Sequence, residues 1–245
     1  TAAQMFWDER LPKQGDLALY RQLCIVGNEA HLSALKPDAG LWEYREREEV
    51  HTFSAAMCWA AQHRLGKIGR RVGAVDEADK WQARARVLRQ KVLKRGTTAG
   101  GWLSGVLDRD MLDASSLVLP EIGLLRSDDP RFHATLDVVG KRLMKNGFVM
   151  RYAEADDFGA PSNAFLLCTF WYIDALASVG RREEALELFI NLLGRRNHLG
   201  LLAEDIDPFT GEMWGNFPQT YSQVGLILSA MRLSRSWEEG LWHAL

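Results

Sequence analysis

The chain has 245 residues, of which 47% are hydrophobic and 25% charged, with a formal net charge of −2. This size and balance are ordinary for a folded protein of one large domain or two small ones, and the near-neutral charge gives no electrostatic reason to expect nucleic acid or an anionic membrane as a partner. The longest apolar stretch, residues 164–179, contains Asp174 and is shorter than the roughly 20 residues that span a bilayer. It therefore predicts a buried helix.

The cysteines and the start of the chain bear on the compartment. Cys24, Cys58 and Cys168 all lie in apolar stretches and lack the spacing of metal ligands, which predicts reduced core thiols in a cytoplasmic protein. No charged-then-apolar signal peptide opens the sequence. The first residue is Thr1 rather than Met, which indicates a processed N-terminus or the start of a fragment.

Helical periodicity dominates the chain. Residues 1–16 are turn-rich and predict an opening segment, whereas residues 17–245 predict a single all-α domain. The predicted helices lie at about residues 16–36, 50–65, 76–95, 111–125, 130–145, 164–179, 183–195 and 218–235. The start at Pro130 is especially well marked, because two acidic residues come directly before the proline. No alternating pattern predicts a strand.

The connections between these helices alternate in character. Short or plain connections near 66–75, 126–130 and 180–182 alternate with long ones. The long connections, near 37–49, 96–110, 146–161 and 196–217, carry Trp42, Trp102, Tyr152 and Trp214. Stacked helical hairpins place every second connection at the same end, so we expect one end lined with aromatic and acidic side chains. A concave binding site should lie there.

Two acids in the long connections are candidates for chemistry. Glu43 lies between Trp42 and Tyr44, where apolar neighbours raise a carboxyl pKa, although Arg45 would oppose that shift. Glu204 stands beside Asp205. Two carboxylates at an aromatic pocket suit glycoside hydrolysis, in which one acid protonates the leaving oxygen while the other activates water.

These two acids lie in segments that resemble a known family. Residues 40–45 (GLWEYR) with 49–54 (EVHTFS) resemble the first catalytic segment of glycoside hydrolase family 15, the glucoamylases and bacterial trehalases. Residues 200–205 (GLLAED) and 215–222 (GNFPQTYS) resemble the second. The stretches LDAS (112–115), VMRY (149–152) and FLLCTFW (165–171) between them match in the same order.

The resemblance implies an (α/α)6 barrel and inverting hydrolysis of terminal α-glucosidic bonds, without a metal or cofactor. Position by position, it makes Glu43 the general acid and Glu204 the general base. The expected substrate-binding residues are Trp42, Arg45, Arg151, Tyr152, Trp102 and Trp214. Aromatic faces stack on sugar rings, and arginine donates paired hydrogen bonds to hydroxyl groups.

The chain also departs from the family pattern. Only about eight of the barrel's twelve helices are predicted, Glu46 follows the first motif where glycine is frequent, and Ser222-Gln223 stands where histidine is frequent. A barrel without a third of its wall would expose apolar helix faces. The expected partner is thus an α-glucoside or oligosaccharide, together with a second copy of the chain or a missing N-terminal part.

Two other functions stay open at this stage. One is a degenerate helical barrel that binds carbohydrate or a protein without catalysis. The other is a different enzyme on a six-hairpin barrel, such as a sugar epimerase, although those typically use histidines and, among the long connections, His198 is the one that stands out. The sequence does not separate trehalose, maltodextrin and dextran as substrates.

Overall fold

The computed structural model describes residues 2–234 and confirms the all-α class. Its eight α-helices within these residues are α1 (Leu17–Ser33), α2 (Thr52–Arg71), α3 (Val75–Gly96), α4 (Leu119–Ile122), α5 (Pro130–Arg142), α6 (Leu166–Ser178), α7 (Arg182–Leu193) and α8 (Thr220–Ser234). Two 3-10 helices, η1 (Ala2–Phe6) and η2 (Ala114–Val118), complete the helical part. The helix predicted at 218–235 corresponds to α8, which is described as far as Ser234. Residues 235–245 lie outside the described residues.

The first half of the fold is a layer of three helices. α2 packs against both α1 and α3, and the turn between α2 and α3 needs only residues 72–74, with Gly73 in the left-handed region at φ 83°. α3 carries Asp76 and Glu77 in its first turn and Lys94 and Arg95 in its last. Charges in these positions favour a helix through its macrodipole.

The second half is organised around α6. This helix is buried over most of its length and packs against α7, α8 and η2, as the uninterrupted apolar sequence predicts. α5 begins at Pro130 as predicted, and the carboxylate of Asp129 caps it by accepting the Arg131 N–H at 3.0 Å.

The predicted helix at 111–125 is wrong. Met111 and Leu112 are in irregular, extended backbone, η2 follows, and α4 has only four residues. Asp113 starts η2 by accepting the Ser115 N–H at 2.7 Å, and Gly123 ends α4 at φ 87°. The segment is apolar because it is buried on several sides, and burial alone does not select a helix.

Within residues 2–234 there are five strands of two residues each, which the sequence did not predict. They join the long connections by backbone pairing. β1 (Met144–Lys145) pairs with β2 (Phe148–Val149), and β3 (Ala164–Phe165), β4 (Asp205–Ile206) and β5 (Met213–Trp214) form an antiparallel sheet. Isolated bridges join His51 to Val106 and Asp113 to Tyr152. The long connections therefore meet one another, as the alternating pattern predicts.

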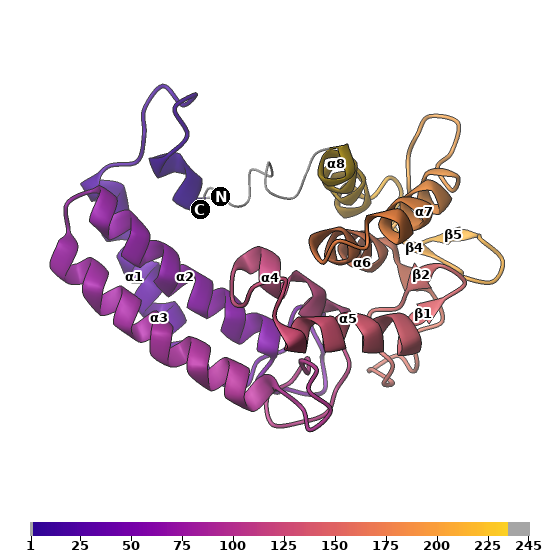
Figure 1. Cartoon of the computed structure of the whole chain (residues 1–245), viewed down its shortest axis with the longest axis horizontal. Helices are drawn as coiled ribbons and strands as arrows, with labels where there is room; N and C mark the ends of the chain where they lie inside the picture. Colours follow the sequence, from indigo (N-terminus) through magenta and orange to yellow (C-terminus); the bar gives the residue numbers. More distant parts are fainter. Residues whose placement is uncertain (1, 235–245) are drawn as a thin grey trace.

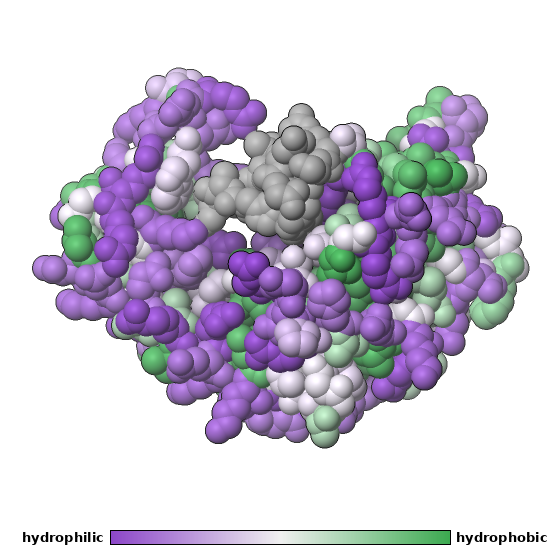
Figure 2. Space-filling model, in the orientation of Figure 1, coloured by the Kyte–Doolittle hydropathy of each residue, from purple (hydrophilic) through white to green (hydrophobic). Residues whose placement is uncertain are grey.

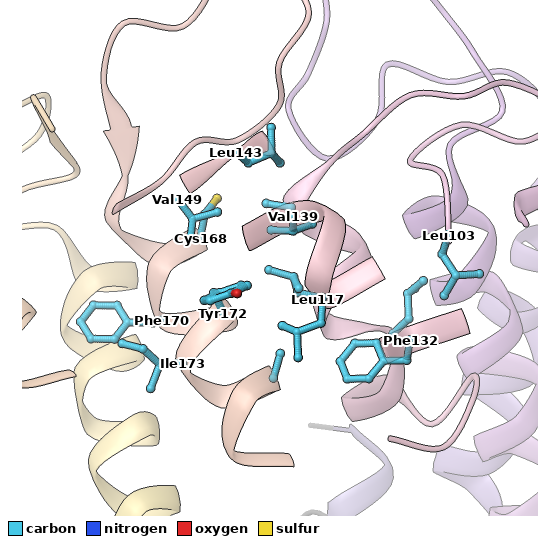
Figure 3. Close-up of a cluster of buried hydrophobic side chains, with 14 of the residues drawn as sticks. Leu103, Leu117, Phe132, Val139, Leu143, Val149, Cys168, Phe170, Tyr172 and Ile173 are labelled. Atoms are coloured by element: carbon cyan, nitrogen blue, oxygen red, sulfur yellow. The ribbon is translucent and has the colours of Figure 1, made fainter. Parts of the chain in front are cut away.

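One hydrophobic core holds the two halves together. Figure 3 shows part of it, where Tyr172 of α6 faces Leu117 of η2 and Val139 of α5, while Phe170 lies on the other side of α6 and packs on Gly225 of α8. A smaller cluster around Phe6, Tyr20 and Trp81 joins the opening segment to the first half.

The helices form an open arc rather than a closed ring (Figure 1). α1–α3 lie on one side, α6–α8 on the other, and α4 and α5 between them. Most of the face seen in Figure 2 is hydrophilic, with smaller hydrophobic patches. Two apolar grooves, of about 460 and 300 Å³, share Met57 and Ile122. Exposed apolar side chains on the first and last of these helices include Ile25, Val26 and Leu32 of α1 and Tyr221, Val224 and Ile227 of α8.

Candidate active site

Trp42 is the centre of an aromatic cluster built from two connections and helix α6. Its ring lies 6.1 Å from Tyr152, 6.0 Å from Phe165 and 6.1 Å from Trp171, measured between ring centroids. The first two contacts are edge-to-face, a favoured arrangement for aromatic pairs. The indole N–H donates a hydrogen bond of 2.8 Å to Oδ2 of Asp113.

Asp113 anchors that hydrogen bond from within the core. Its side chain is buried, and burial raises the pKa of the carboxyl, while hydrogen bonds from Ser115 and Trp42 oppose the rise. The neighbouring Ala114 N–H donates to the Arg151 carbonyl at 2.9 Å. The Asp113 carboxylate also caps η2 by accepting the Ser115 N–H.

Glu43 follows Trp42 in a tight turn. Its side chain is exposed and its φ of 56° lies in the left-handed region, which is uncommon for residues other than glycine. The turn is closed by the Glu43 N–H, which donates to the Gly40 carbonyl at 3.2 Å, and by the Tyr44 N–H, which donates to Ala39 at 2.9 Å. The carboxylate is thus presented at the rim of the aromatic cluster.

Tyr44 and His51 pack against each other at the base of this turn. Their rings stack 5.7 Å apart at 17°, and the Arg47 guanidinium lies 4.0 Å from the centre of the Tyr44 ring. Gly40 packs so closely on the His51 ring that a Cβ atom added to it would lie 2.8 Å away. These contacts fix the base of the turn.

Arg45 lies toward the 153–160 connection. Its backbone N–H donates to Asp157 Oδ2 at 2.6 Å, and its guanidinium lies 5.1 Å from the Phe158 ring centre. Asp156 accepts a hydrogen bond from the Tyr152 hydroxyl. The pair Asp156-Asp157 therefore joins two connections of the site.

Glu204 is half-buried and held by Asn216. Its Oε2 accepts the Asn216 backbone N–H at 3.0 Å and the Nδ2–H at 2.8 Å. Its own backbone N–H donates to the Asn216 carbonyl at 3.0 Å, and its carbonyl accepts the Leu166 N–H at 3.0 Å. Ser222 of α8 donates to the carbonyl of Ala203 at 2.7 Å. The carboxylate is therefore positioned by neighbours on both sides.

Arg151 and Asp205 lie beside the aromatic cluster. The Arg151 guanidinium is 6.0 Å from the Tyr152 ring centre and 5.8 Å from that of Phe165. Burial raises the pKa of Asp205 to about 6, the Arg151 charge opposes the rise, and the Glu204 charge adds to it. Asp205 and Arg151 therefore share one electrostatic environment next to Glu204.

The structure brings the two acidic motifs to one cluster. Trp42, next to Glu43, contacts Phe165, and Phe165 pairs with Asp205, next to Glu204. Trp102 is partly buried against the main core, and Trp214 is half-exposed on β5 opposite Asp205. Neither of the two apolar grooves includes Glu43 or Glu204.

Sequence reasoning gave no role to Asn216 or Trp171, although both stand in the quoted motifs. Only the fold shows that Asn216 reaches Glu204 and that Trp171 of α6 touches Trp42. In residues 2–234, His, Cys, Asp and Glu form no group of three or more that could hold a metal ion. Across the same residues, no helix is both long and apolar enough to cross a membrane.

Comparison with known proteins decides the family. The family described as glycosyl hydrolases family 15 matches residues 33–231. The chain belongs to this family. The match covers both acidic motifs and the helices between them. Family 15 membership agrees with the resemblance seen in residues 40–54 and 200–222.

The chain is also similar in sequence to proteins named trehalase. The chain is 36% identical over 207 residues to a trehalase of Mycolicibacterium smegmatis and 32% identical over 203 residues to one of Thermoplasma volcanium, matching 83% and 82% of this chain. These matches span only 31% and 32% of those two trehalases.

Solved structures support the fold. A wild-type glycosidase structure aligns with a TM-score of 0.75 at 21% identity, covering 89% of this chain and 61% of that one. A bacterial glucoamylase in complex with acarbose aligns with a TM-score of 0.72 at 16% identity, covering 90% of this chain and 39% of that one. The open arc of helices therefore corresponds to part of the six-hairpin glycosidase fold.

Proposed function

We propose that this chain carries the catalytic acids of an enzyme that hydrolyses terminal α-glucosidic bonds with inversion. Glu43 is the general acid and Glu204 the general base. The observation that carries the proposal is the meeting of the two acidic motifs at the cluster of Trp42 and Phe165. An inverting mechanism needs one carboxylic acid to protonate the leaving oxygen and one carboxylate to activate water from the opposite face.

The geometry supports different roles for the two acids. The Glu204 carboxylate accepts two N–H groups from Asn216, which fix its direction, as a base that must aim at one water molecule requires. Glu43 is exposed at the rim, where a leaving group would depart. Trp42, Arg45, Arg151, Tyr152, Trp102 and Trp214 are proposed to bind sugar, and the names of the relatives favour trehalose as the substrate.

The test is turnover by the complete polypeptide that contains this chain. Glucose release from trehalose, maltose and isomaltose is measured for the wild type, Glu43→Gln and Glu204→Gln, with circular dichroism as the folding control. Each substitution should lower kcat by several orders of magnitude. Proton NMR during hydrolysis should show β-glucose released from the attacked residue before mutarotation, with an equal amount of α-glucose as the leaving group when trehalose is the substrate. Near-wild-type turnover in either variant would refute the assignment of that acid.

The alternative is a carbohydrate- or protein-binding barrel without catalysis. The open arc and its apolar edges on α1 and α8 favour it. We propose instead that these edges pack against further helices of a longer polypeptide or a second copy of the chain. Binding of trehalose by calorimetry, without glucose release from any of the three sugars, would favour the alternative.

We further propose a cytoplasmic location. Cys24, Cys58 and Cys168 are all free thiols in the structure, which is typical of a reducing compartment. Fractionation of cells that express the native gene tests the location directly.

A further inference from the structure

We propose that Asp113 is a positioning residue for Glu43 and acts through the indole of Trp42. The inference rests on the proposed role of Glu43 as general acid. Asp113 itself is buried in the core and belongs to a different connection, 71 residues from Trp42.

Asp113 has little freedom to move. Its Oδ1 accepts the Ser115 N–H at 2.7 Å, and its backbone forms a bridge with Tyr152. Gly105 approaches so closely that a Cβ atom added there would lie 2.5 Å from Cβ of Asp113. The carboxylate is therefore a fixed acceptor for Trp42.

The hydrogen bond selects one orientation of the indole. Contacts with Tyr152, Phe165 and Trp171 hold the ring in a slot, but a ring flipped by about 180° would fill a similar volume. Flipping would remove the N–H from Asp113 and leave a buried carboxylate oxygen without its donor, which is unfavourable. The Asp113 carboxylate therefore fixes the indole in one position.

This orientation bears directly on Glu43. The Glu43 side chain is exposed and directly follows Trp42 in the chain, so its direction depends on the turn that carries it. That turn is closed at Glu43 by a hydrogen bond of 3.2 Å, which is long for an N–H to a carbonyl. The side chain of Trp42, directly before it, reaches into the core. A tilt of Trp42 would thus change where the acid points.

Two substitutions test the link. Asp113→Asn can accept only one of the two N–H groups that now point at its carboxylate, and Trp42→Phe keeps a ring but removes the donor. In the complete polypeptide, each should lower kcat at least tenfold. KM should change less than threefold in Asp113→Asn, because Asp113 is buried and is not one of the proposed sugar-binding residues. The double variant should be no worse than Trp42→Phe alone, because both changes break the same interaction.

Asp129→Asn is the matched control, because Asp129 also caps a helix through the N–H two residues on but does not contact Trp42. It should lower stability without changing kcat. The indole proton resonance of Trp42, assigned by its loss in Trp42→Phe, should shift in Asp113→Asn.

A leaving group that needs no protonation separates positioning from general damage. With α-glucosyl fluoride, the loss in Asp113→Asn should shrink to less than threefold, because fluoride departs without an acid. The loss in Trp42→Phe should also shrink, to the part that is due to the sugar contact of Trp42. Equal losses on the fluoride and on the natural glucoside would overturn the inference, as would additive losses in the double variant. If Glu43→Gln is inactive while both variants keep wild-type kcat, only the positioning role fails. If Glu43→Gln retains wild-type kcat, the proposed function fails as well.

Discussion

Gly215 packs directly on the carboxylate of Glu204. A Cβ atom added at Gly215 would stand 2.8 Å from Oε2 and 2.9 Å from Cβ of Glu204, closer than carbon atoms approach in folded proteins. The glycine also adopts φ 79°. The carboxylate of the proposed base thus rests against bare backbone.

Gly215→Ala should therefore displace Glu204 and lower kcat at least tenfold. Gly200→Ala is the control, because Gly200 has almost the same φ of 80° but open space where its Cβ would lie. Both variants should lose about 1–2 kcal/mol of stability from left-handed strain, and only Gly215→Ala should lose activity. Equal kcat in the two variants would contradict the contact.

Asn216→Ala removes one of the two hydrogen bonds that Glu204 accepts. The Nδ2–H contact of 2.8 Å is lost, while the backbone N–H contact of 3.0 Å stays. A hydrogen bond to a charged group contributes about 1.5–3 kcal/mol, so kcat should fall roughly 10- to 150-fold. Asn28→Ala, which removes a surface contact with Arg84, should leave kcat unchanged. A loss below threefold in Asn216→Ala would show that the backbone contact alone positions Glu204.

Arg151→Met should raise the pKa of Asp205 further above its value of about 6, because the Arg151 charge opposes the effect of burial. A carbon-13 NMR titration of aspartate carboxyl groups measures the shift, with Asp205→Asn to assign the resonance. Arg195→Met is the control, since its guanidinium lies 5.5 Å from the Phe148 ring centre instead. An unchanged or lowered Asp205 pKa in Arg151→Met would exclude this coupling.

Asp174 should make stability depend on pH. Burial raises the pKa of this α6 carboxyl from 3.8 to about 6, although Arg232 and a 2.8 Å hydrogen bond from Ser229 oppose the rise. Between pH 3.8 and about 6 the folded state binds more protons at Asp174 than the unfolded state does. The contribution of Asp174 to the free energy of unfolding is therefore present below pH 4 and is lost as the pH rises through 6. At about 1.4 kcal/mol per pKa unit, the loss is about 3 kcal/mol.

Urea denaturation between pH 4 and 8 measures this dependence. Asp174→Asn should flatten the curve of unfolding free energy against pH, whereas Asp137→Asn on the exposed face of α5 should not. Asp205, with a pKa also raised to about 6, contributes in the same direction and leaves a residual slope. An unchanged slope in Asp174→Asn would refute the assignment.

Helical periodicity predicted most of the fold. Seven of the eight predicted segments contain one helix with nearby bounds. In α3, apolar side chains at helical spacing, such as Trp81 and Val92, are buried, whereas apolar side chains of α1 and α8, such as Val26 and Val224, are exposed. The exception at 111–125 is buried on several sides, so its apolar run carries no period. Helix α8 begins at Thr220, two residues after the predicted start at about Pro218.

The candidate site was predicted only in part. Motif context indicated Glu43, Glu204 and the aromatic residues near them. It could not reveal that Trp42 donates to Asp113 across 71 positions or that Asn216 holds Glu204, because such contacts depend on how the connections meet in space. The positions of these residues in the sequence do not indicate the contacts.

At the left-handed turn of Glu43, the residue that favours stability differs from the residue that the proposed reaction needs. Asparagine and glycine tolerate φ 56° better than glutamate, yet neither can give a proton to a leaving group. Glu43→Asn should therefore keep or raise the free energy of unfolding while it removes turnover, whereas the same change at Glu49, outside the left-handed region, should not stabilise. A search for stabilising substitutions would select against the acid that the proposed reaction needs.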